Sequence, residues 1–385
     1  MIPLSVPLEH LGKPVRWAVL AGLVLAAWAC STAKAKDITA ELRLPPGFEI
    51  EVFANVPQAR TLVLARELGV VFISTRADTI YAVPLRDDDG LYPTYPLLRG
   101  LRSPNGIAWK DGYLYVAEQH RLTRYHVPSI DALPGKGPEV LFDRLPDKSW
   151  HGNRYIRFGS HNGQPDGALY VGVGAACNVC SLHGYEGSIL KFTPGNWQNP
   201  EITATGVRNT VGLDVRPGTG RIYFTDNGAD GMGDNSPPDE LNVLTPGGHY
   251  GFPWYGGGED RTPHFEMLTP PEGTIAPVVR FQAHVAPLGL DFYEGRLFPP
   301  EYQGDAFVAQ RGSWNRSSKV GYRIVRVRFD GAGQVQGVEP FIEGWLQPQE
   351  RVTGRPVDLE ELPDGSLLIS DDTAGVVYRV TYKKL

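Results

Sequence analysis

The sequence has no excess of positive charge and is poor in lysine. Its formal net charge is −6 at pH 7 and no basic face extends over the chain, which argues against a protein that binds nucleic acid. Lysine supplies 10 of the 37 basic residues, so arginine supplies the remaining 27. Because a guanidinium can donate paired hydrogen bonds to carboxylates and phosphates, these basic residues are suited to holding small anionic groups.

Apolar runs long enough to cross a membrane are also missing. The run from Ala18 to Ala29 is too short to span a bilayer comfortably, and it follows two basic residues. Alanines in a small-x-small pattern come next, which is typical of a cleavable signal peptide. We therefore predict that residues 1–35 are a signal peptide and that the mature chain begins near Asp37.

Such a leader predicts a periplasmic or secreted protein. Cys30 directly follows the apolar run, so a lipid-anchored mature protein is one alternative, and an uncleaved anchor is another. Between Asp37 and Leu385 nothing resembles a linker or a low-complexity tail. Residues 37–385 are therefore expected to form one domain without a membrane span.

The exported chain would keep two cysteines, Cys177 and Cys180, within the segment CNVCSLH. A haem c attachment site has histidine directly after the second cysteine, whereas Ser181 stands there, which argues against covalent haem. In an exported protein the pair predicts a disulfide across a small loop. Redox activity and metal ligation are the alternatives.

A glycine followed by a short apolar strand recurs six times. The segments that follow these glycines are VVFIST after Gly69, YLYVAE after Gly112, ALYVGVG after Gly167, RIYFTD after Gly220, DAFVAQ after Gly304 and SLLISDD after Gly365. One apolar strand precedes each glycine turn and, in most units, another follows the second strand. Each unit therefore predicts an antiparallel meander.

The spacing of the repeats predicts the fold class. Successive turn glycines are 43, 55, 53, 84 and 61 residues apart, which is close to one four-stranded blade with variable insertions. The abundance of glycine and proline, 45 and 33 residues, suits many short strands joined by turns. We predict an all-β, six-bladed β-propeller. A β-sandwich is the alternative, but it does not require one motif repeated along the chain.

The ring is expected to close through the N-terminal strand. Residues Leu44 to Ala54 predict an entry strand that completes a blade contributed mostly by the C-terminus, which would hide the sheet edges.

Meander geometry predicts which loops share a face of the propeller. The loop before the first strand of a unit and the loop after its second strand lie at the same end of the sheet. These loops contain Asn105, His151, Arg154, Arg208, Asn209, His284 and Arg355 before first strands, and Arg76, Glu118, Cys177, Asp226, Gln310, Arg311, Asp371 and Asp372 after second strands. We expect one face to collect them around the axis, where a ligand would bind.

Ordered motifs along these loops resemble a known family, the soluble glucose and sorbosone dehydrogenases, six-bladed propellers that bind pyrroloquinoline quinone (PQQ). The motifs are HGNR at His151, RNTVGL at Arg208, TDNG followed by DELN, GGHYGFP at Gly247, APLGL at Ala286, GDAFVAQRGSWNR at Gly304, and GRPVD with DDTAG near the end. The likeness runs from about Leu44 to the C-terminus. It is greatest to the sorbosone dehydrogenase branch, which shares the CNVC segment.

The resemblance implies roles for individual residues. His151 is similar to the family's general base, with a structural histidine as the alternative, and Gly228 and Ala229 match positions whose carbonyls hold a calcium ion. Asp226, in the same acidic loop, is a further candidate ligand for calcium, which prefers oxygen. The implied cofactor contacts are Arg208, Asn209, Gln310, Arg311, Arg355 and Asp372.

Two departures from the glucose enzymes of the family stand out. Gln310 and Arg311 occupy the place of a cofactor lysine, and Trp150 replaces the acidic residue before the catalytic histidine. The second departure argues against glucose itself as the substrate.

The chemistry suits these residues. PQQ carries three carboxylates, and Arg208, Arg311 and Arg355 would offer paired donors to them. A neutral imidazole at His151 would accept a hydroxyl proton while hydride leaves the same carbon.

Three functional interpretations follow. The first is a PQQ- and calcium-dependent dehydrogenase that oxidises an aldose or a sugar-derived aldehyde such as sorbosone and passes electrons to an external acceptor, a cytochrome or a quinone. The second is a metal-dependent propeller hydrolase of the lactonase type. The third is a binding propeller without a cofactor.

Overall fold

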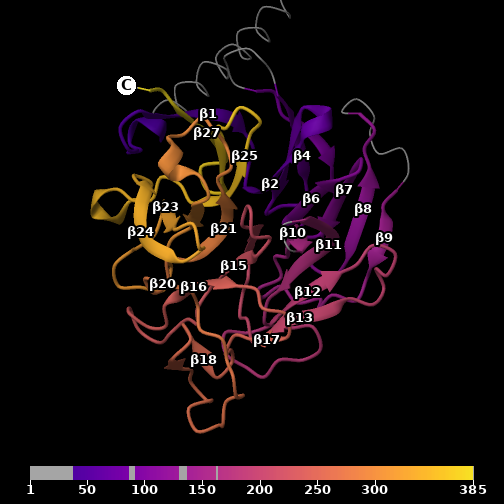
Figure 1. The fold of residues 1–385 in the computed structure, drawn as a ribbon, viewed down its shortest axis with the longest axis vertical. Coiled ribbons are helices and arrows are strands. Elements are labelled where there is room, and N and C mark those ends of the chain that lie inside the picture. Colours follow the sequence, from indigo (N-terminus) through magenta and orange to yellow (C-terminus); the bar gives the residue numbers. More distant parts are fainter. Residues whose placement is uncertain (1–37, 86–91, 130–136, 162–163, 385) are drawn as a thin grey trace, which may run out of the picture. The chain divides into compact units, whose positions relative to one another are not determined.

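Short strands joined by turns make up nearly all of the regular structure (Figure 1). The computed structural model describes residues 38–85, 92–129, 137–161 and 164–384. The predicted signal peptide and Cys30 lie outside these residues. In the described ranges, no helix has the length and apolar character needed to cross a bilayer.

The first three sheets follow one another along the chain and are antiparallel, and we call each sheet a blade. Blade 1 contains β2 (Ala59–Ala65), β3 (Val70–Thr75), β4 (Ile80–Pro84) and β5 (Tyr95–Leu98). Blade 2 contains β6 (Gly106–Lys110), β7 (Tyr113–Ala117), β8 (Leu122–His126) and β9 (Glu139–Phe142). Blade 3 contains β10 (Tyr155–His161), β11 (Gln164–Val173), β12 (Ser188–Phe192) and β13 (Glu201–Thr205).

The next three blades are also antiparallel. In blade 4 the fourth strand follows an insertion, and in blade 6 the fourth strand comes from the N-terminal part of the chain. Blade 4 contains β14 (Gly212–Val215), β15 (Ile222–Asp226), β16 (Asp239–Val243) and β20 (Val279–Phe281). Blade 5 contains β21 (Pro287–Phe292), β22 (Ala306–Gln310), β23 (Arg323–Phe329) and β24 (Val335–Ile342). Blade 6 contains β25 (Pro356–Glu361), β26 (Leu367–Asp371), β27 (Val376–Tyr382) and β1 (Phe48–Asn55).

An insertion between β16 and β20 carries the remaining short strands. β17 (Gly248–His249) adds to blade 3 as a parallel neighbour of β13, and β18 (Tyr255–Gly256) pairs with β19 (Asp260–Arg261). The described residues also contain three 3-10 turns, η1 (Arg66–Leu68), η2 (Pro300–Tyr302) and η3 (Pro348–Glu350).

The first strands of the six blades form a closed ring. Each first strand contacts the first strand of the next blade, in the order β2, β6, β10, β14, β21 and β25. β25 in turn contacts β2. The described chain is therefore a six-bladed β-propeller, as the repeated turn glycines predicted.

The turn glycines have a backbone reason for recurring. Each of the six has a positive φ, between 61° at Gly69 and 83° at Gly365. Residues with a Cβ rarely adopt this left-handed conformation, so glycine is the residue that lets the first strand turn into the second. The pattern was visible in the sequence because the backbone requires it in every blade.

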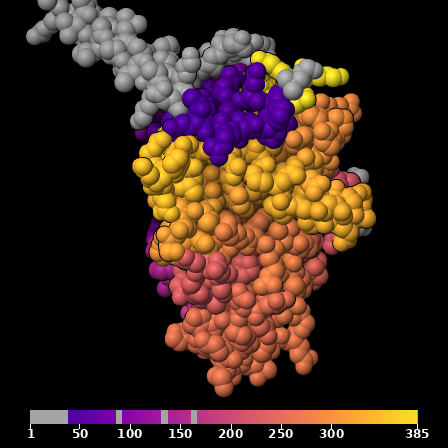
Figure 2. Space-filling model, turned by 90° about the vertical axis from the view of Figure 1, so that its left-hand side faces the viewer, coloured from indigo at the N-terminus to yellow at the C-terminus, as the bar shows by residue number. Residues whose placement is uncertain are grey.

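The N-terminal strand closes the ring. β1 pairs antiparallel with β27 from Phe48, opposite Tyr382, to Asn55, opposite Val376. Figure 2 shows the indigo N-terminal residues against the yellow C-terminal ones. This pairing confirms the predicted entry strand, and it covers the outer edge of blade 6.

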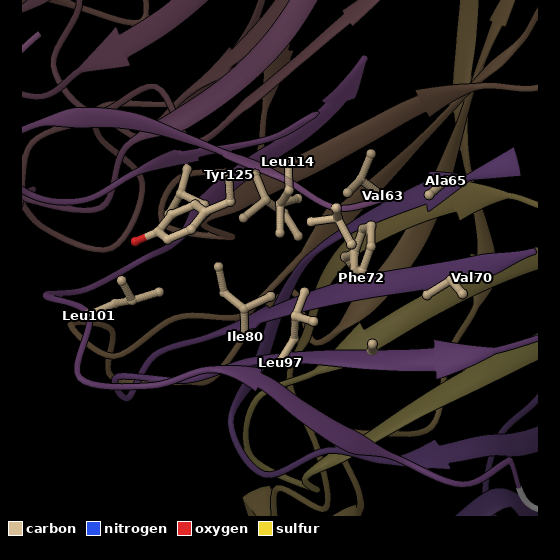
Figure 3. Packing of buried hydrophobic residues seen from close by; sticks show 13 residues of the cluster. Val63, Ala65, Val70, Phe72, Ile80, Leu97, Leu101, Leu114 and Tyr125 are labelled. Carbon is tan, nitrogen blue, oxygen red and sulfur yellow. The ribbon is translucent and has the colours of Figure 1, made fainter. Parts of the chain in front are cut away.

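The hydrophobic core lies between neighbouring blades. Side chains of blades 1 and 2, among them Phe72, Ile80 and Leu114, pack into one cluster (Figure 3). A strand between two packed sheet faces is buried on both sides, so β3 is VVFIST with all six residues buried. The outermost strand β24, VQGVEPFI, instead alternates between partly buried and exposed residues over its first six positions.

Candidate active site

A cavity of about 210 Å³ lies where the first strands of the blades begin and the second strands end. Its lining consists of Arg60, Arg76, His151, Asn153, Arg208, Asn209, Val211, Asn227, Gly228, Asp230, Asp239, His284, Ala286, Leu288, Arg311, Trp314 and Asn315. Most of these residues come from loops of the two predicted kinds. Loops of blades 1, 3, 4 and 5 therefore meet at this cavity, while its lining among the described residues includes none from blades 2 and 6.

The structure brings half of the predicted site residues to this cavity. His151, Arg208, Asn209, Arg311 and Gly228 line it. The others lie behind the lining: Gln310, Arg355, Asp372, Asp226 and Ala229. Gln310, for example, is 1% exposed and its Oε1 accepts a hydrogen bond from Nε of Arg323 at 2.8 Å. Of the pair that replaces the family lysine, Arg311 therefore faces the cavity.

His151 has a defined tautomer. Its Nδ1 lies 2.8 Å from the carbonyl oxygen of Ala175, and its Nε2 lies 3.1 Å from Nε1 of Trp150. A carbonyl can only accept a hydrogen bond and an indole N–H can only donate one. The proton is therefore on Nδ1, and Nε2 carries the lone pair that a general base uses.

Burial keeps His151 neutral. Desolvation, followed by the positive charge of Arg208, lowers the pKa of His151 to about 3. The residue has φ 49°, and a Cβ at Gly174 would lie 2.6 Å from the Cβ of His151. Glycine at position 174 thus leaves the space that the backbone and the Cβ of His151 occupy.

Arg208 is held by the loop that the cysteines close. Cys177 and Cys180 form a disulfide, and Asn178 lies between them. The carbonyl oxygen of Asn178 accepts a hydrogen bond from Nε of Arg208 at 2.9 Å, and its Oδ1 accepts one from Nη2 at 2.7 Å.

Most donors of Arg208 are already occupied. Nη2 also donates to Oδ2 of Asp230 at 3.0 Å, and Nη1 donates to the carbonyl of Asn227 at 3.1 Å. Since a guanidinium has five N–H groups and four of these donate to the protein, Arg208 retains one for a ligand. The paired donors expected from the sequence are therefore not offered by Arg208 in this conformation.

Two other arginines share a single carboxylate. Asp372 accepts from Nε and Nη2 of Arg311 at 3.0 and 3.1 Å and from Nη1 of Arg60 at 3.1 Å. Burial alone would raise the pKa of Asp372, but Arg60 and Arg311 outweigh burial and lower it. Asp372 therefore holds two cavity arginines in place as their counterion.

Arg355 lies one layer back from the cavity. Its Nη2 donates to the hydroxyl of Tyr322 at 3.3 Å, and its guanidinium stacks 5.0 Å from the centre of the Tyr322 ring. Burial, followed by the charge of Arg311, lowers the pKa of Arg355. Arg355 therefore adds its positive charge to that of the cavity arginines, although it does not line the cavity itself.

The acidic loop arranges backbone oxygens more than free carboxylates. Asp226 accepts hydrogen bonds from the backbone N–H groups of Arg208 and Asn209 at 2.7 and 2.6 Å. Asp239 accepts one from the N–H of Gly228 at 2.7 Å. In the described part of the chain, no three His, Cys, Asp or Glu side chains are grouped to hold a metal ion.

Among described residues, no donor hydrogen-bonds to the carbonyl oxygen of Gly228 or Ala229. Asn315 lines the cavity, and its buried Oδ1 has no hydrogen-bond partner in the part of the chain that the structure describes. A calcium ion here would depend on such neutral oxygens, which suit it.

Sequence reasoning missed several lining residues. Arg60, Asn153, Trp314 and Asn315 were not singled out, although each lies in or beside a quoted motif or predicted strand. Arg60 directly precedes the apolar segment TLVLA, so the loop rule applied one residue earlier would have included it. Trp314 is 72% exposed at the cavity, which only the structure reveals.

The chain matches a known family and a full-length relative. The family model described as "Glucose / Sorbosone dehydrogenase" matches residues 129–379. A protein of Borreliella burgdorferi, described as uncharacterized, is 35% identical over 370 residues, which cover 92% of this chain and 94% of the relative.

Solved structures share the fold at lower identity. A calcium structure of a Trichoderma reesei carbohydrate-active enzyme of family AA12 has a TM-score of 0.75 at 18% identity, covering 89% of this chain and 97% of that chain. The holo PQQ domain of a pyranose dehydrogenase from Coprinopsis cinerea has a TM-score of 0.73 at 17% identity, covering 88% and 97%. The PQQ-bound aldose sugar dehydrogenase of Streptomyces coelicolor has a TM-score of 0.62 at 19% identity, covering 89% and 100%.

Proposed function

The chain belongs to the glucose / sorbosone dehydrogenase family, and from that membership we propose that it is a PQQ-dependent oxidoreductase. Its substrate would be an aldose or a sugar-derived aldehyde such as sorbosone, and its electrons would pass to an external acceptor. We assign it to the sorbosone branch on the CNVC segment, whose Asn178 contacts Arg208.

The observation that carries this proposal is the state of His151. It is a neutral imidazole with an acceptor Nε2, and it lines a cavity together with four arginines, Arg60, Arg76, Arg208 and Arg311. A general base must be unprotonated and within reach of the hydroxyl that it deprotonates. Nε2 would accept the hydroxyl proton of the substrate, while Nδ1 stays bonded to Ala175.

The donor set suits a polycarboxylate. Arg60 and Arg311 share Asp372 as their counterion and the charge of Arg355 lies nearby, so the combined positive charge of the three arginines is not cancelled. Arg311 keeps three guanidinium N–H groups free of protein acceptors among the described residues, and Asn209 lies beside Arg208 in the lining. We infer that Arg311, Arg208 and Asn209 contact PQQ directly and that Arg355 and Asp372 support them.

Bound PQQ would supply the acceptor for a hydride from the substrate carbon. Calcium would be held at the carbonyls of Gly228 and Ala229, with Asp226 fixing the backbone of Arg208 and Asn209 behind it. Gln310 would act through Arg323, to which it is bonded.

Reconstitution tests this proposal. The purified chain would be titrated with PQQ and calcium, followed by PQQ absorbance, and then assayed with aldoses and an artificial electron acceptor. Oxidation that requires PQQ is the expected result. Turnover of a lactone or ester with metal alone would instead support a hydrolase, and neither activity would favour a binding protein.

Export is a separate proposal. It rests on the leader pattern of residues 1–35 and on the Cys177–Cys180 disulfide, since disulfides persist in oxidising compartments. The mature protein would be periplasmic or secreted, either free or lipid-anchored through Cys30. Mass spectrometry of protein from the native host would locate the mature N-terminus, and an intact Met1 would contradict cleavage.

A further inference from the structure

Among the described residues, no carboxylate pairs with the cavity-lining Arg76. It follows β3, it is exposed, and it forms no ion pair or side-chain hydrogen bond with any residue that the structure describes. The other lining arginines differ, because Arg60 and Arg311 pair with Asp372 and Arg208 pairs with Asp230. Arg76 therefore presents a complete guanidinium to the cavity.

The surroundings of Arg76 are positive. Arg60 is buried, and besides this burial the charges of Arg311 and Arg76 act to lower its pKa to about 10 against the opposing effect of Asp372. Arg76 likewise adds to the lowering of the pKa of Arg355. Like charges gathered in a partly desolvated site repel one another, and a bound anion relieves that repulsion.

The two carboxylates of the cavity lining already have hydrogen-bond partners other than Arg76. Asp230 accepts hydrogen bonds from Arg208 and Asn315, and Asp239 accepts them from the backbone N–H groups of Gly228 and Ala286. Both aspartates belong to blade 4. Beside the base stands Trp150, which carries no charge to repel an anionic substrate.

The position of Arg76 in the ring of blades favours contact with the substrate over contact with the cofactor. The residues proposed to contact the cofactor and calcium come from blades 4 and 5, their supporting residues Arg355 and Asp372 come from blade 6, and the base precedes blade 3. Arg76 comes from blade 1, which contributes only Arg60 to the proposed donor set. Of the two cavity-lining arginines of blade 1, Arg60 already bonds to Asn105 and Asp372, so Arg76 is the one whose guanidinium has no partner among the described residues.

We propose that the substrate is an acidic sugar, an aldose of the uronic acid type, whose carboxylate pairs with Arg76 while its reacting hydroxyl faces His151. This inference rests on the proposed function for the reaction, but not for the binding. A guanidinium matches a carboxylate with two parallel hydrogen bonds, which gives geometric selectivity over a neutral hydroxymethyl group.

Paired sugars test the inference. Glucuronate and glucose differ at C6, a carboxylate against a hydroxymethyl group, and so do galacturonate and galactose. Titration calorimetry would measure the affinity of the full chain for each sugar, with and without PQQ and calcium. A charged hydrogen-bonded pair favours glucuronate over glucose by about 10- to 100-fold.

Substitution of Arg76 should remove this preference. R76Q is expected to lower the ratio of glucuronate to glucose affinity by at least about 10-fold, and R76K should retain part of it. R66Q is the matched control, because Arg66 is an exposed arginine of the same blade that does not line the cavity. It should leave the ratio unchanged.

The outcomes separate the inference from the proposed function. Equal affinity of the wild type for glucuronate and glucose would overturn the inference. So would an R76Q variant that weakens PQQ binding and leaves the sugar ratio unchanged, because Arg76 would then serve the cofactor. Arg76-dependent glucuronate binding without any PQQ-dependent oxidation would support the inference and overturn the dehydrogenase.

Discussion

The indole N–H of Trp150 donates a hydrogen bond to Nε2 of His151 at 3.1 Å, so the lone pair of the imidazole is covered in the absence of substrate. Trp150 is 51% exposed, which leaves the ring room to move. A substrate hydroxyl would have to displace the indole before His151 can accept its proton. Trp150 is thus positioned to compete with the substrate for His151, the proposed base.

Replacing Trp150 with Phe should lower KM. The variant keeps an aromatic ring but removes the competing N–H, and a hydrogen bond of this kind contributes about 0.5–1.5 kcal/mol, or about 2- to 10-fold in KM. Steady-state kinetics of the reconstituted enzyme would measure the change. A KM that rises well above the wild-type value would mean that Trp150 holds the substrate instead.

Gly174→Ala should displace His151, the proposed base. The new Cβ would lie 2.6 Å from the Cβ of His151 and 2.9 Å from its carbonyl oxygen, so His151 or its backbone must shift. Overpacking of this kind costs about 1–3 kcal/mol, and we expect lower Tm together with lower kcat.

Gly331→Ala is the matched control, because a Cβ at position 331 would meet no atom within 4 Å. It should change neither Tm nor kcat. A Gly174→Ala variant with wild-type kcat would show that the close approach does not position His151.

In the pH profile of kcat/KM, the loss of activity on the acid side should lie far below pH 6.5, the ordinary pKa of histidine. Burial and Arg208 lower the pKa of His151 from 6.5 to about 3. Between those values the unfolded chain binds more protons than the native one, so this contribution to stability is fully present above about pH 6.5 and is lost as pH falls toward 3.

The profile of kcat/KM reports groups of the free enzyme. Rates measured across the range that the protein survives should therefore show no loss centred near pH 6.5. An acid limb in that region would mean that His151 is solvated and ordinary when the enzyme is free.

Reducing the Cys177–Cys180 disulfide should weaken PQQ binding. The loop that it closes holds Asn178, which bonds to Arg208 through both its carbonyl and its side chain. Looser positioning of that arginine should raise the PQQ Kd severalfold, as fluorescence titration with and without reductant would measure. A double variant, C177S/C180S, should not respond to reductant, and an unchanged Kd for reduced wild type would contradict the link.

The fold was predictable because its determinants are local. Each blade needs a left-handed turn, and glycine marks it at the same point in all six repeats, from Gly69 to Gly365. The closing strand was equally visible as one apolar strand without a meander of its own. The direction of the strands then predicted which loops lie at the same end of the sheets. This reasoning placed His151, Arg208 and Arg311 together.

The internal pairing of the site was not predictable from the sequence. Arg60 and Asp372 bond across 312 residues, and they meet only because the ring closes between blades 6 and 1. The contact between Asn178 and Arg208, which decides how many donors remain for a ligand, could not be predicted from the sequence either. Residue types indicate what can bond, whereas the partner that uses each donor depends on tertiary packing.

The roles of His151 and of the arginines should separate by mutation. The central measurement compares wild type with H151A after reconstitution, recording PQQ affinity and aldose turnover on the same preparations. H126A is the control, because His126 is exposed on β8 and does not line the cavity.

We predict that H151A binds PQQ with nearly wild-type affinity and turns over substrate at least about 100-fold more slowly, the usual loss for a general base. H126A should match the wild type in both respects. Wild-type turnover by a PQQ-loaded H151A enzyme would contradict the account.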